Sequence, residues 1–99
     1  MFVMELTYTA PIEDVDEHLD AHVAWLDGHY AAGTFLASGR KVPRDGGVII
    51  ATGMSRAEIE RVAQGDPFVL AGVCAYRITE FIATKTSASL AAARETLPT

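Results

Sequence analysis

Hydrophobic and polar residues first alternate along this chain and then repeat at helical spacing. Residues 2–9 carry an apolar side chain at every second position, which is typical of a strand with one apolar face: Phe2, Met4, Leu6 and Tyr8. Residues 12–32 change to a longer period, and Gly33 follows at a natural helix end. The pattern predicts a strand followed by a helix.

The predicted helix over residues 12–32 has two stripes. At about 100° per residue, one apolar arc collects Val15, Leu19, Val23, Leu26 and Tyr30. A second stripe on its shoulder holds aromatic and imidazole side chains: His18, His22, Trp25 and His29. We expect the apolar arc to pack on a sheet and the second stripe to lie at the margin of the core, where a cleft could open.

The rest of the chain predicts a hairpin, a short helix, a helix restart and a last strand. Residues 34–39 and 47–52 read as strands joined by a turn at Asp45-Gly46-Gly47. Ser55 and Glu58 have the spacing of a capping box, and the helix they begin ends at Gly65. Asp66-Pro67 restarts a helix, and residues 73–84 form the last strand. The order β-α-β-β-α-β predicts an α+β domain with helices on one face of an antiparallel sheet.

Two surfaces of this domain predict further contacts. The second sheet face is partly apolar through Val3, Val73, Ala75 and Phe81, so we expect a homodimer that packs sheet against sheet. Residues 85–99 place Leu90, Ala93 and Leu97 at helical spacing. A tail helix docked on its own domain or on a partner is one expectation, and fraying is the other, because a short unpacked helix is marginal in water.

Composition and charge reduce the number of partner classes that this protein could bind. The 99 residues carry 13 acidic and 8 basic side chains, a formal charge of -5, without a basic cluster, so nucleic acid and anionic membranes are not expected partners. We expect no secretory signal and no transmembrane segment. The single cysteine, Cys74, lies in an apolar strand pattern and predicts a buried, inert thiol in a reducing cytoplasm.

His22 and Asp66 are the candidates for chemistry. Imidazole alone among side chains titrates near neutrality, as a general acid or base requires. A carboxylate on one ring nitrogen would fix the tautomer and stabilise the protonated ring, and Asp66 could supply it. The alternatives are structural, since a lone histidine is more often packed or solvated and an aspartate before proline is more often a helix cap.

Other chemistry finds little support in the sequence. His18 and His22 have a spacing that can hold a metal, with His29 two turns further on, but a zinc site needs a third ligand and outer support from elsewhere, so no metal is expected. No phosphate-binding loop, dinucleotide fingerprint or nucleophile elbow is present. The residues therefore indicate cofactor-independent chemistry. The aromatic residues Trp25, Phe68, Tyr8 and Tyr76 are most often core residues. Trp25 and Phe68 nonetheless flank the two candidate polar groups in sequence and could line a small-molecule pocket.

Two segments resemble the YCII-related family. They are Asp66-Pro67-Phe68-Val69-Leu70-Ala71-Gly72-Val73 and the Ala-His-x-x-x-Leu stretch around His22, and the resemblance spans residues 1–84, leaving 85–99 as a tail. It implies a ferredoxin-like fold that dimerises into an α+β barrel, with a histidine and an aspartate in a cleft at the positions of His22 and Asp66. Ser38 and Arg40 would lie at that cleft. Arg40 stands where the family usually has proline and could clamp a carboxylate, although a solvated arginine in a loop is the commoner case.

Three functions remain open. The first is a small cytoplasmic lyase or isomerase that moves a proton or eliminates a group on an aromatic-derived or lactone-like molecule, with His22 as acid or base and Asp66 orienting it. The second is a non-catalytic dimeric module that binds a small molecule in the same cleft. The third is an oligomerisation unit without a ligand.

Overall fold

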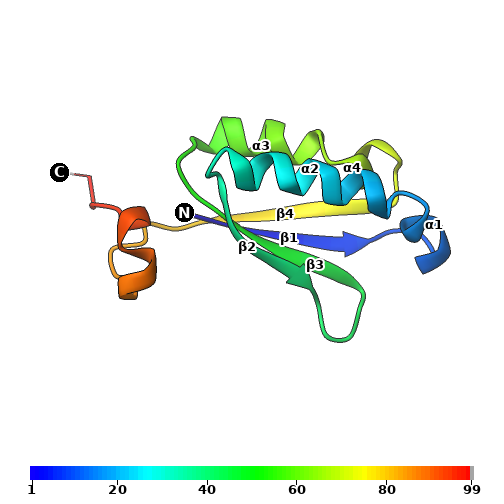
Figure 1. Ribbon diagram of the computed structural model, residues 1–99, viewed down its shortest axis with the longest axis horizontal. Helices are drawn as coiled ribbons and strands as arrows, with labels where there is room; N and C mark the ends of the chain where they lie inside the picture. The colour runs from blue at the N-terminus through cyan, green and yellow to red at the C-terminus, as the bar shows by residue number, and fades with distance from the viewer. Residues whose placement is uncertain (99) are drawn as a thin grey trace.

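Alternating apolar residues build one antiparallel sheet in the order β2-β3-β1-β4 (Figure 1). The computed structural model describes residues 1–98. Its strands are β1 (Phe2–Tyr8), β2 (Phe35–Arg40), β3 (Gly46–Ala51) and β4 (Cys74–Glu80). β1 is central, so Met4 pairs with Ile49 of β3 on one side and with Ile78 of β4 on the other. This split arrangement, in the order βαββαβ, confirms the predicted ferredoxin-like α+β fold.

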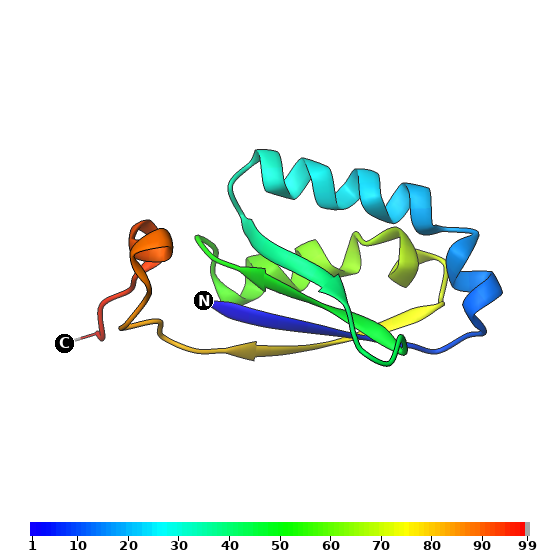
Figure 2. The same ribbon diagram turned by 60° about the horizontal axis from the view of Figure 1, so that its bottom comes forward.

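The helices lie on one face of the sheet (Figures 1 and 2). α2 (Leu19–Ala31) runs beside α3 (Arg56–Gln64) and α4 (Pro67–Leu70), while α1 (Ile12–Asp16) lies at the end of the sheet. The side chains between the two layers form the core, which includes Phe2, Met4, Leu6, Phe35, Ile49, Ile59 and Phe68. The predicted capping box is present, because the Ser55 hydroxyl accepts from the Glu58 backbone N–H and the Glu58 carboxylate accepts from the Ser55 backbone N–H.

The predicted helix over residues 12–32 is wrong in one respect. The chain forms two helices, because His18 leaves the helical conformation at φ -108 and ψ 6. The break rotates α2 relative to the expected phase, so His22 is 9% exposed while Val23 is 43% exposed. The imidazole and aromatic stripe therefore faces the core, and part of the predicted apolar arc faces solvent.

The second sheet face carries no helix in residues 1–98 (Figure 2). Val3, Val48 and Ile50 lie on it and are half-buried. Val73 was expected there, but it precedes β4 and belongs to the core. The apolar character of this face thus comes from β1 and β3 more than was predicted. The sheet-to-sheet homodimer stays a prediction.

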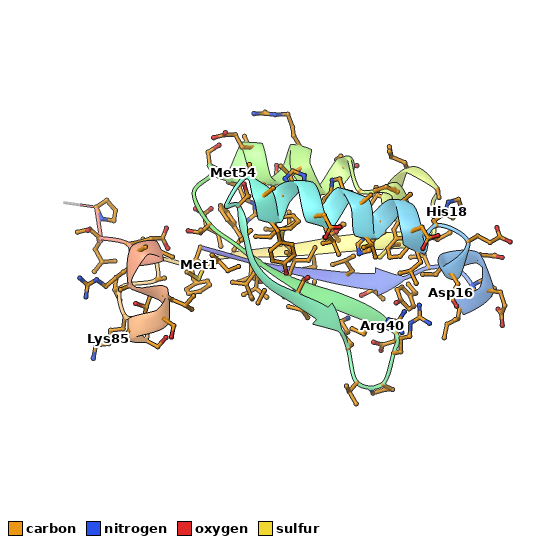
Figure 3. The ribbon with its side chains drawn as sticks, in the orientation of Figure 1. Met1, Asp16, His18, Arg40, Met54 and Lys85 are labelled. Carbon is orange, nitrogen blue, oxygen red and sulfur yellow. The ribbon has the colours of Figure 1, made fainter. Side chains whose placement is uncertain are left out.

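The chain beyond β4 extends past the end of the sheet at which β1 begins, where Met1 and Lys85 are labelled in Figure 3. The helix expected in the tail is limited to the 3₁₀ helix η1 (Ala88–Ala93). Ala83 and Glu95 close this segment, because the Ala83 N–H donates to the Glu95 carboxylate at 2.8 Å and the Glu95 N–H donates to the Ala83 carbonyl at 2.9 Å. Thr99, the last residue of the predicted tail helix, lies outside the described residues.

No helix within residues 1–98 combines the length and the apolar character that crossing a bilayer requires.

Candidate functional site

Asp66 sits at the junction between α3 and α4 and is fully buried. Gly65 ends α3, and Pro67 occupies the first turn of α4, where it needs no N–H donor. The Asp66 carboxylate caps α4, since its Oδ1 accepts the Phe68 backbone N–H at 2.9 Å. The local sequence thus fixes the carboxylate at the centre of the helix layer.

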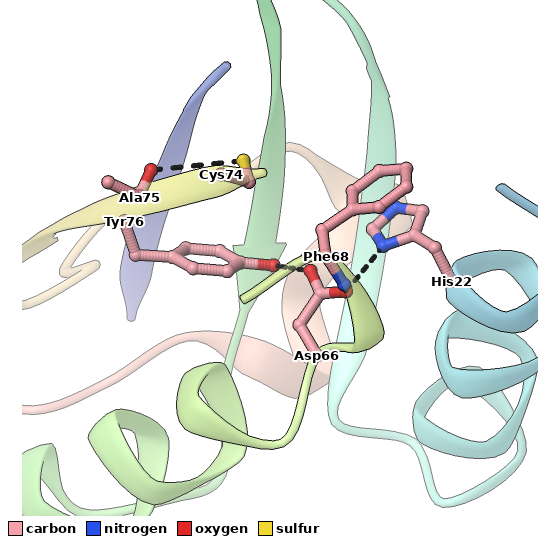
Figure 4. A network of polar contacts seen from close by, with 6 residues as sticks. All are labelled: His22, Asp66, Phe68, Cys74, Ala75 and Tyr76. Carbon is pink, nitrogen blue, oxygen red and sulfur yellow. Dashed lines mark hydrogen bonds and ion pairs between the residues drawn. The ribbon is translucent and has the colours of Figure 1, made fainter. Parts of the chain in front are cut away.

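His22 reaches this carboxylate from α2 (Figure 4). Its Nδ1 lies 2.8 Å from Asp66 Oδ1. The imidazole stacks on the Phe68 ring, with 4.0 Å between ring centroids and 9° between planes. Trp25 packs on the same imidazole at a centroid distance of 5.7 Å. The structure therefore brings together His22 and Asp66, which are 44 residues apart in sequence.

Tyr76 of β4 occupies the second oxygen of the carboxylate. Its hydroxyl donates to Asp66 Oδ2 in a short hydrogen bond (Figure 4). Burial, the Asp66 charge and this hydrogen bond raise the pKa of Tyr76 far above its ordinary value. Both oxygens of Asp66 are thereby engaged, which holds the carboxylate in one orientation toward His22.

The charge of Asp66 also acts on the neighbouring cysteine. Burial, with the Asp66 charge as the second cause, raises the pKa of the Cys74 thiol to about 11. At neutral pH this thiol is protonated, and a protonated thiol is a poor nucleophile. Cys74 therefore does not add a nucleophile to the site.

The hydrogen bond to Asp66 leaves the other ring nitrogen of His22 for a ligand. A carboxylate only accepts, so in the neutral ring the proton resides on Nδ1 and the lone pair on Nε2. Nε2 makes no hydrogen bond within residues 1–98, and it is not a fully buried unpaired atom. His22 can thus accept or return a proton at Nε2.

His22 lines a pocket of about 330 Å³ between α2 and the sheet. Leu6, Leu19, Leu26 and Phe68 supply apolar surface. On the sheet side the lining includes Gly39, Gly46 and Gly47, which present no side chain. A mostly apolar hollow with a few polar groups is the usual form of a small-molecule site, and this volume is at the small end of the usual range.

Three of the four predicted binding residues line this pocket, namely Ser38, Arg40 and Phe68. Ser38 and Arg40 face the helices because they pair with Ile49 and Gly47 of β3. The Ser38 hydroxyl is held by the Tyr30 hydroxyl at 2.6 Å. Trp25 does not line the pocket: its ring packs edge-on against Phe35, and it supports the imidazole from behind.

The other two histidines are separate from the carboxylate pair. His18 precedes the first turn of α2, and His29 packs against Phe35 at a centroid distance of 4.8 Å. Within residues 1–98, no three His, Cys, Asp or Glu side chains are grouped as a metal site requires.

Sequence reasoning missed Tyr8 and Tyr76, which it treated as core residues. Tyr8 lines the pocket, and its oxygen accepts from Arg44 Nε at 3.2 Å, so the hydroxyl hydrogen remains a donor. A signal was present in the strand alternation, which places both tyrosines on the helix-facing side of the sheet. A tyrosine on a buried face needs a partner for its hydroxyl.

A larger, shallow hollow of about 840 Å³ lies between α3 and β4. Arg56 and Glu60 line it and pair with each other at 2.9 Å. No histidine among residues 1–98 lines it, and neither does Asp66; it shares Tyr76 with the carboxylate site. The smaller pocket is therefore the better candidate for chemistry.

Residues 1–82 match the YCII-related domain. The chain belongs to the YCII-related family. No curated protein matches its sequence. Among solved structures, this YCII-related protein is similar to the 5-chloro-2-hydroxyhydroquinone dehydrochlorinase TftG from Burkholderia phenoliruptrix AC1100, in complex with 2,5-dihydroxybenzoquinone. The match has a TM-score of 0.69 and 19% identity, and covers 82% of this chain and 93% of that one. At this identity the likeness establishes the shared fold.

Proposed function

We propose that this YCII-related protein is a cofactor-independent lyase or isomerase acting on a small aromatic-derived or lactone-like molecule. The observation that carries the proposal is the 2.8 Å contact between His22 Nδ1 and the fully buried Asp66 carboxylate, which leaves Nε2 free to act at a pocket. This arrangement suits general acid–base catalysis, where one ring nitrogen is oriented and the other transfers the proton.

In the proposed elimination, the leaving group stands on a saturated ring carbon, as in the keto tautomer of a chlorinated hydroquinone, and His22 Nε2 takes the proton of a hydroxyl group conjugated with that carbon. The electron pair of the broken O–H bond forms a carbonyl, the ring double bond between them shifts by one position, and the leaving group departs with the electrons of its own bond. The imidazolium is stabilised by Asp66 and later returns the proton to water. In the proposed isomerisation, the same ring returns the proton to a different atom of the substrate. Neither route needs an oxidant or a reductant.

The family and the structural neighbour support this class of reaction. TftG is a dehydrochlorinase of a hydroquinone, and its structure holds a quinone. The pocket of this chain has a size suited to a single ring, and Phe68 offers an aromatic surface beside His22.

The test offers chlorinated hydroquinones and lactones to the purified protein and follows chloride release and ultraviolet absorbance. His22→Gln keeps a polar side chain but removes the base, and we expect kcat to fall by about 10²-fold or more. Asp66→Asn keeps the shape of the cap but removes the charge, and it should also lower kcat. The proposal fails if both variants turn substrate over like the wild type.

His29→Gln provides a matched control. His29 lies on the same helix as His22 but does not line the pocket, and its partners are Trp25 and Phe35. Its kcat should equal that of the wild type. A loss as large as that of His22→Gln would show that the assay reports the packing of α2 rather than proton transfer.

A non-catalytic binding module is the second candidate. Among the described residues that line the pocket, His22 alone carries a carboxyl, imidazole, thiol or amine group, and the other proton donors there are the hydroxyls of Tyr8 and Ser38 and the Arg40 guanidinium. Saturable ligand binding, with no turnover of either substrate class by the wild type, would favour this function.

A further inference from the structure

The described part of the chain lines the pocket beside His22 with a basic residue and no acidic one, although the protein as a whole is acidic. The protein carries 13 acidic residues and a net charge of -5. No aspartate or glutamate within residues 1–98 lines the pocket, and Arg40 is the one lysine or arginine that does. A cation that faces an apolar hollow without an acid opposite it is a recognition element for an anion.

The charge of Arg40 is not taken up by a neighbour. The hairpin that contains it has three basic residues, and the other two are paired: Lys41 lies 2.9 Å from Glu5, and Arg44 lies 2.6 Å from Asp16. Arg40 makes no ion pair or side-chain hydrogen bond to any described residue. Asp16 lies at the same end of the sheet as Arg40 (Figure 3). The hydrogen bond that the Asp16 carboxylate accepts from Arg44 is the largest of the causes that lower its pKa, and the Arg40 charge is the smallest.

The backbone opens the space between Arg40 and the pocket. Arg40 on β2 pairs with Gly47 on β3, and Gly47 pairs with Leu6 on β1, so all three positions face the helices. A Cβ atom at Gly47 would stand 2.9 Å from the Gly39 carbonyl oxygen, which leaves little room for any side chain there. The glycine therefore leaves the sheet surface bare where a ligand would run from His22 toward Arg40.

We propose that the ligand of this pocket is a single-ring molecule that bears a carboxylate, with the ring beside His22 and Phe68 and the carboxylate on the Arg40 guanidinium. The planar guanidinium can meet a carboxylate with two parallel hydrogen bonds. Ser38, between them on β2, supplies a further hydroxyl. This inference rests on the proposed function in one respect, because both concern the pocket beside His22. It adds the class of substrate that the pocket would take.

The test uses benzoate and benzamide, which have the same ring and nearly the same size but differ in charge. Titrations at neutral pH are followed by NMR shifts of backbone amides and by calorimetry. We expect the wild type to bind benzoate about tenfold more tightly than benzamide, the effect of one charge-assisted contact. Arg40→Gln should remove that preference without changing the affinity for benzamide. Arg40→Lys, which keeps the charge but loses the fork, should retain part of it.

Lys41→Gln is the control, because it removes the same charge one residue away, where Lys41 pairs with Glu5 rather than lining the pocket. It should keep the full preference for benzoate, and thermal unfolding confirms that each variant is folded. Equal affinity for the two probes, a preference that survives Arg40→Gln, or no binding of either probe would overturn the proposal.

Because binding is measured without turnover, this result is separate from the test of proton transfer. His22→Gln should keep the preference for benzoate even if it abolishes activity. Loss of activity in His22→Gln, together with equal binding of benzoate and benzamide by the wild type, would leave the proposed function standing and remove the carboxylate.

Discussion

The pocket lies between two regions that are built in opposite ways. On the helix side, Asp66 is fully buried, and its two oxygens are engaged by three donors from α2, α4 and β4. On the β2 edge, Arg40 is exposed, and its side chain makes no ion pair or hydrogen bond to any of residues 1–98. The first region has its polar groups fixed by the fold before any ligand arrives, whereas the second has a charge that only a ligand would engage. We infer that the buried side would set the chemistry and the open side the choice of ligand.

Removal of the buried carboxylate should have the largest effect on the difference between the two sides of the pocket. Asp66→Ala leaves the Phe68 N–H, the Tyr76 hydroxyl and the His22 ring without their acceptor. Breaking a buried charged network by removing one member costs about 3–5 kcal/mol, a large part of the stability of a small domain. Urea unfolding should therefore show a marked fall in the free energy of unfolding.

Asp27→Ala is the matched control for this loss. Asp27 is exposed on α2, and its side chain makes no hydrogen bond to a described residue, so the change should stay within about 0.5 kcal/mol. If Asp66→Ala were as mild as Asp27→Ala, the helix side would not be the rigid part of the pocket.

Much of the fold follows from local patterns in the sequence. The period-two alternation in residues 2–9 gave β1, and Ser55 with Glu58 gave the start of α3, because both features act through neighbouring residues. The Asp66-Pro67 pair likewise predicted the cap of α4 from sequence. The break at His18 was not predicted, because no proline or glycine marks it, and α2 took the phase that lets His22 reach Asp66.

The candidate site was predicted only in part, for a related reason. His22 was named for its imidazole and Asp66 as an acid that could orient it, and the family resemblance placed the two in one cleft, since spacing alone does not indicate that residues 44 apart will meet. Tyr76 was missed because its role depends on register: it lies opposite Leu6, and that position directs its hydroxyl toward α4. Sequence periodicity shows which face a residue occupies, but not which polar group on the facing helix lies above it.

Tyr76→Phe tests the buried side with a smaller change. It keeps the ring but removes the donor to Asp66 Oδ2, and a hydrogen bond to a charged group contributes about 2 kcal/mol. We expect that loss in urea unfolding, and in an active enzyme a lower kcat at an unchanged KM, because Tyr76 orients the Asp66 carboxylate that holds His22. Tyr30→Phe, which removes the exposed hydroxyl beside Ser38, should leave stability nearly unchanged. A Tyr76→Phe variant as stable as the wild type would contradict the fixed orientation of the carboxylate.

Alkaline pH should lower the free energy of unfolding through Cys74, which lies near the buried Asp66. This is the smallest of the expected effects. Burial and the Asp66 charge raise the pKa of Cys74 from 9.0 to about 11. Between those values the unfolded thiol loses its proton while the folded one keeps it, so the free energy of unfolding falls as pH rises through this window. Urea unfolding from about pH 7 to about pH 10 should show this decline in the wild type and a shallower one in Cys74→Ala. Tyr76 also has a raised pKa, so it lowers the free energy of unfolding further, in both proteins, only when the pH exceeds the ordinary tyrosine pKa of 10.0. Parallel curves for the two proteins up to that point would mean that burial and the Asp66 charge do not raise the pKa of Cys74.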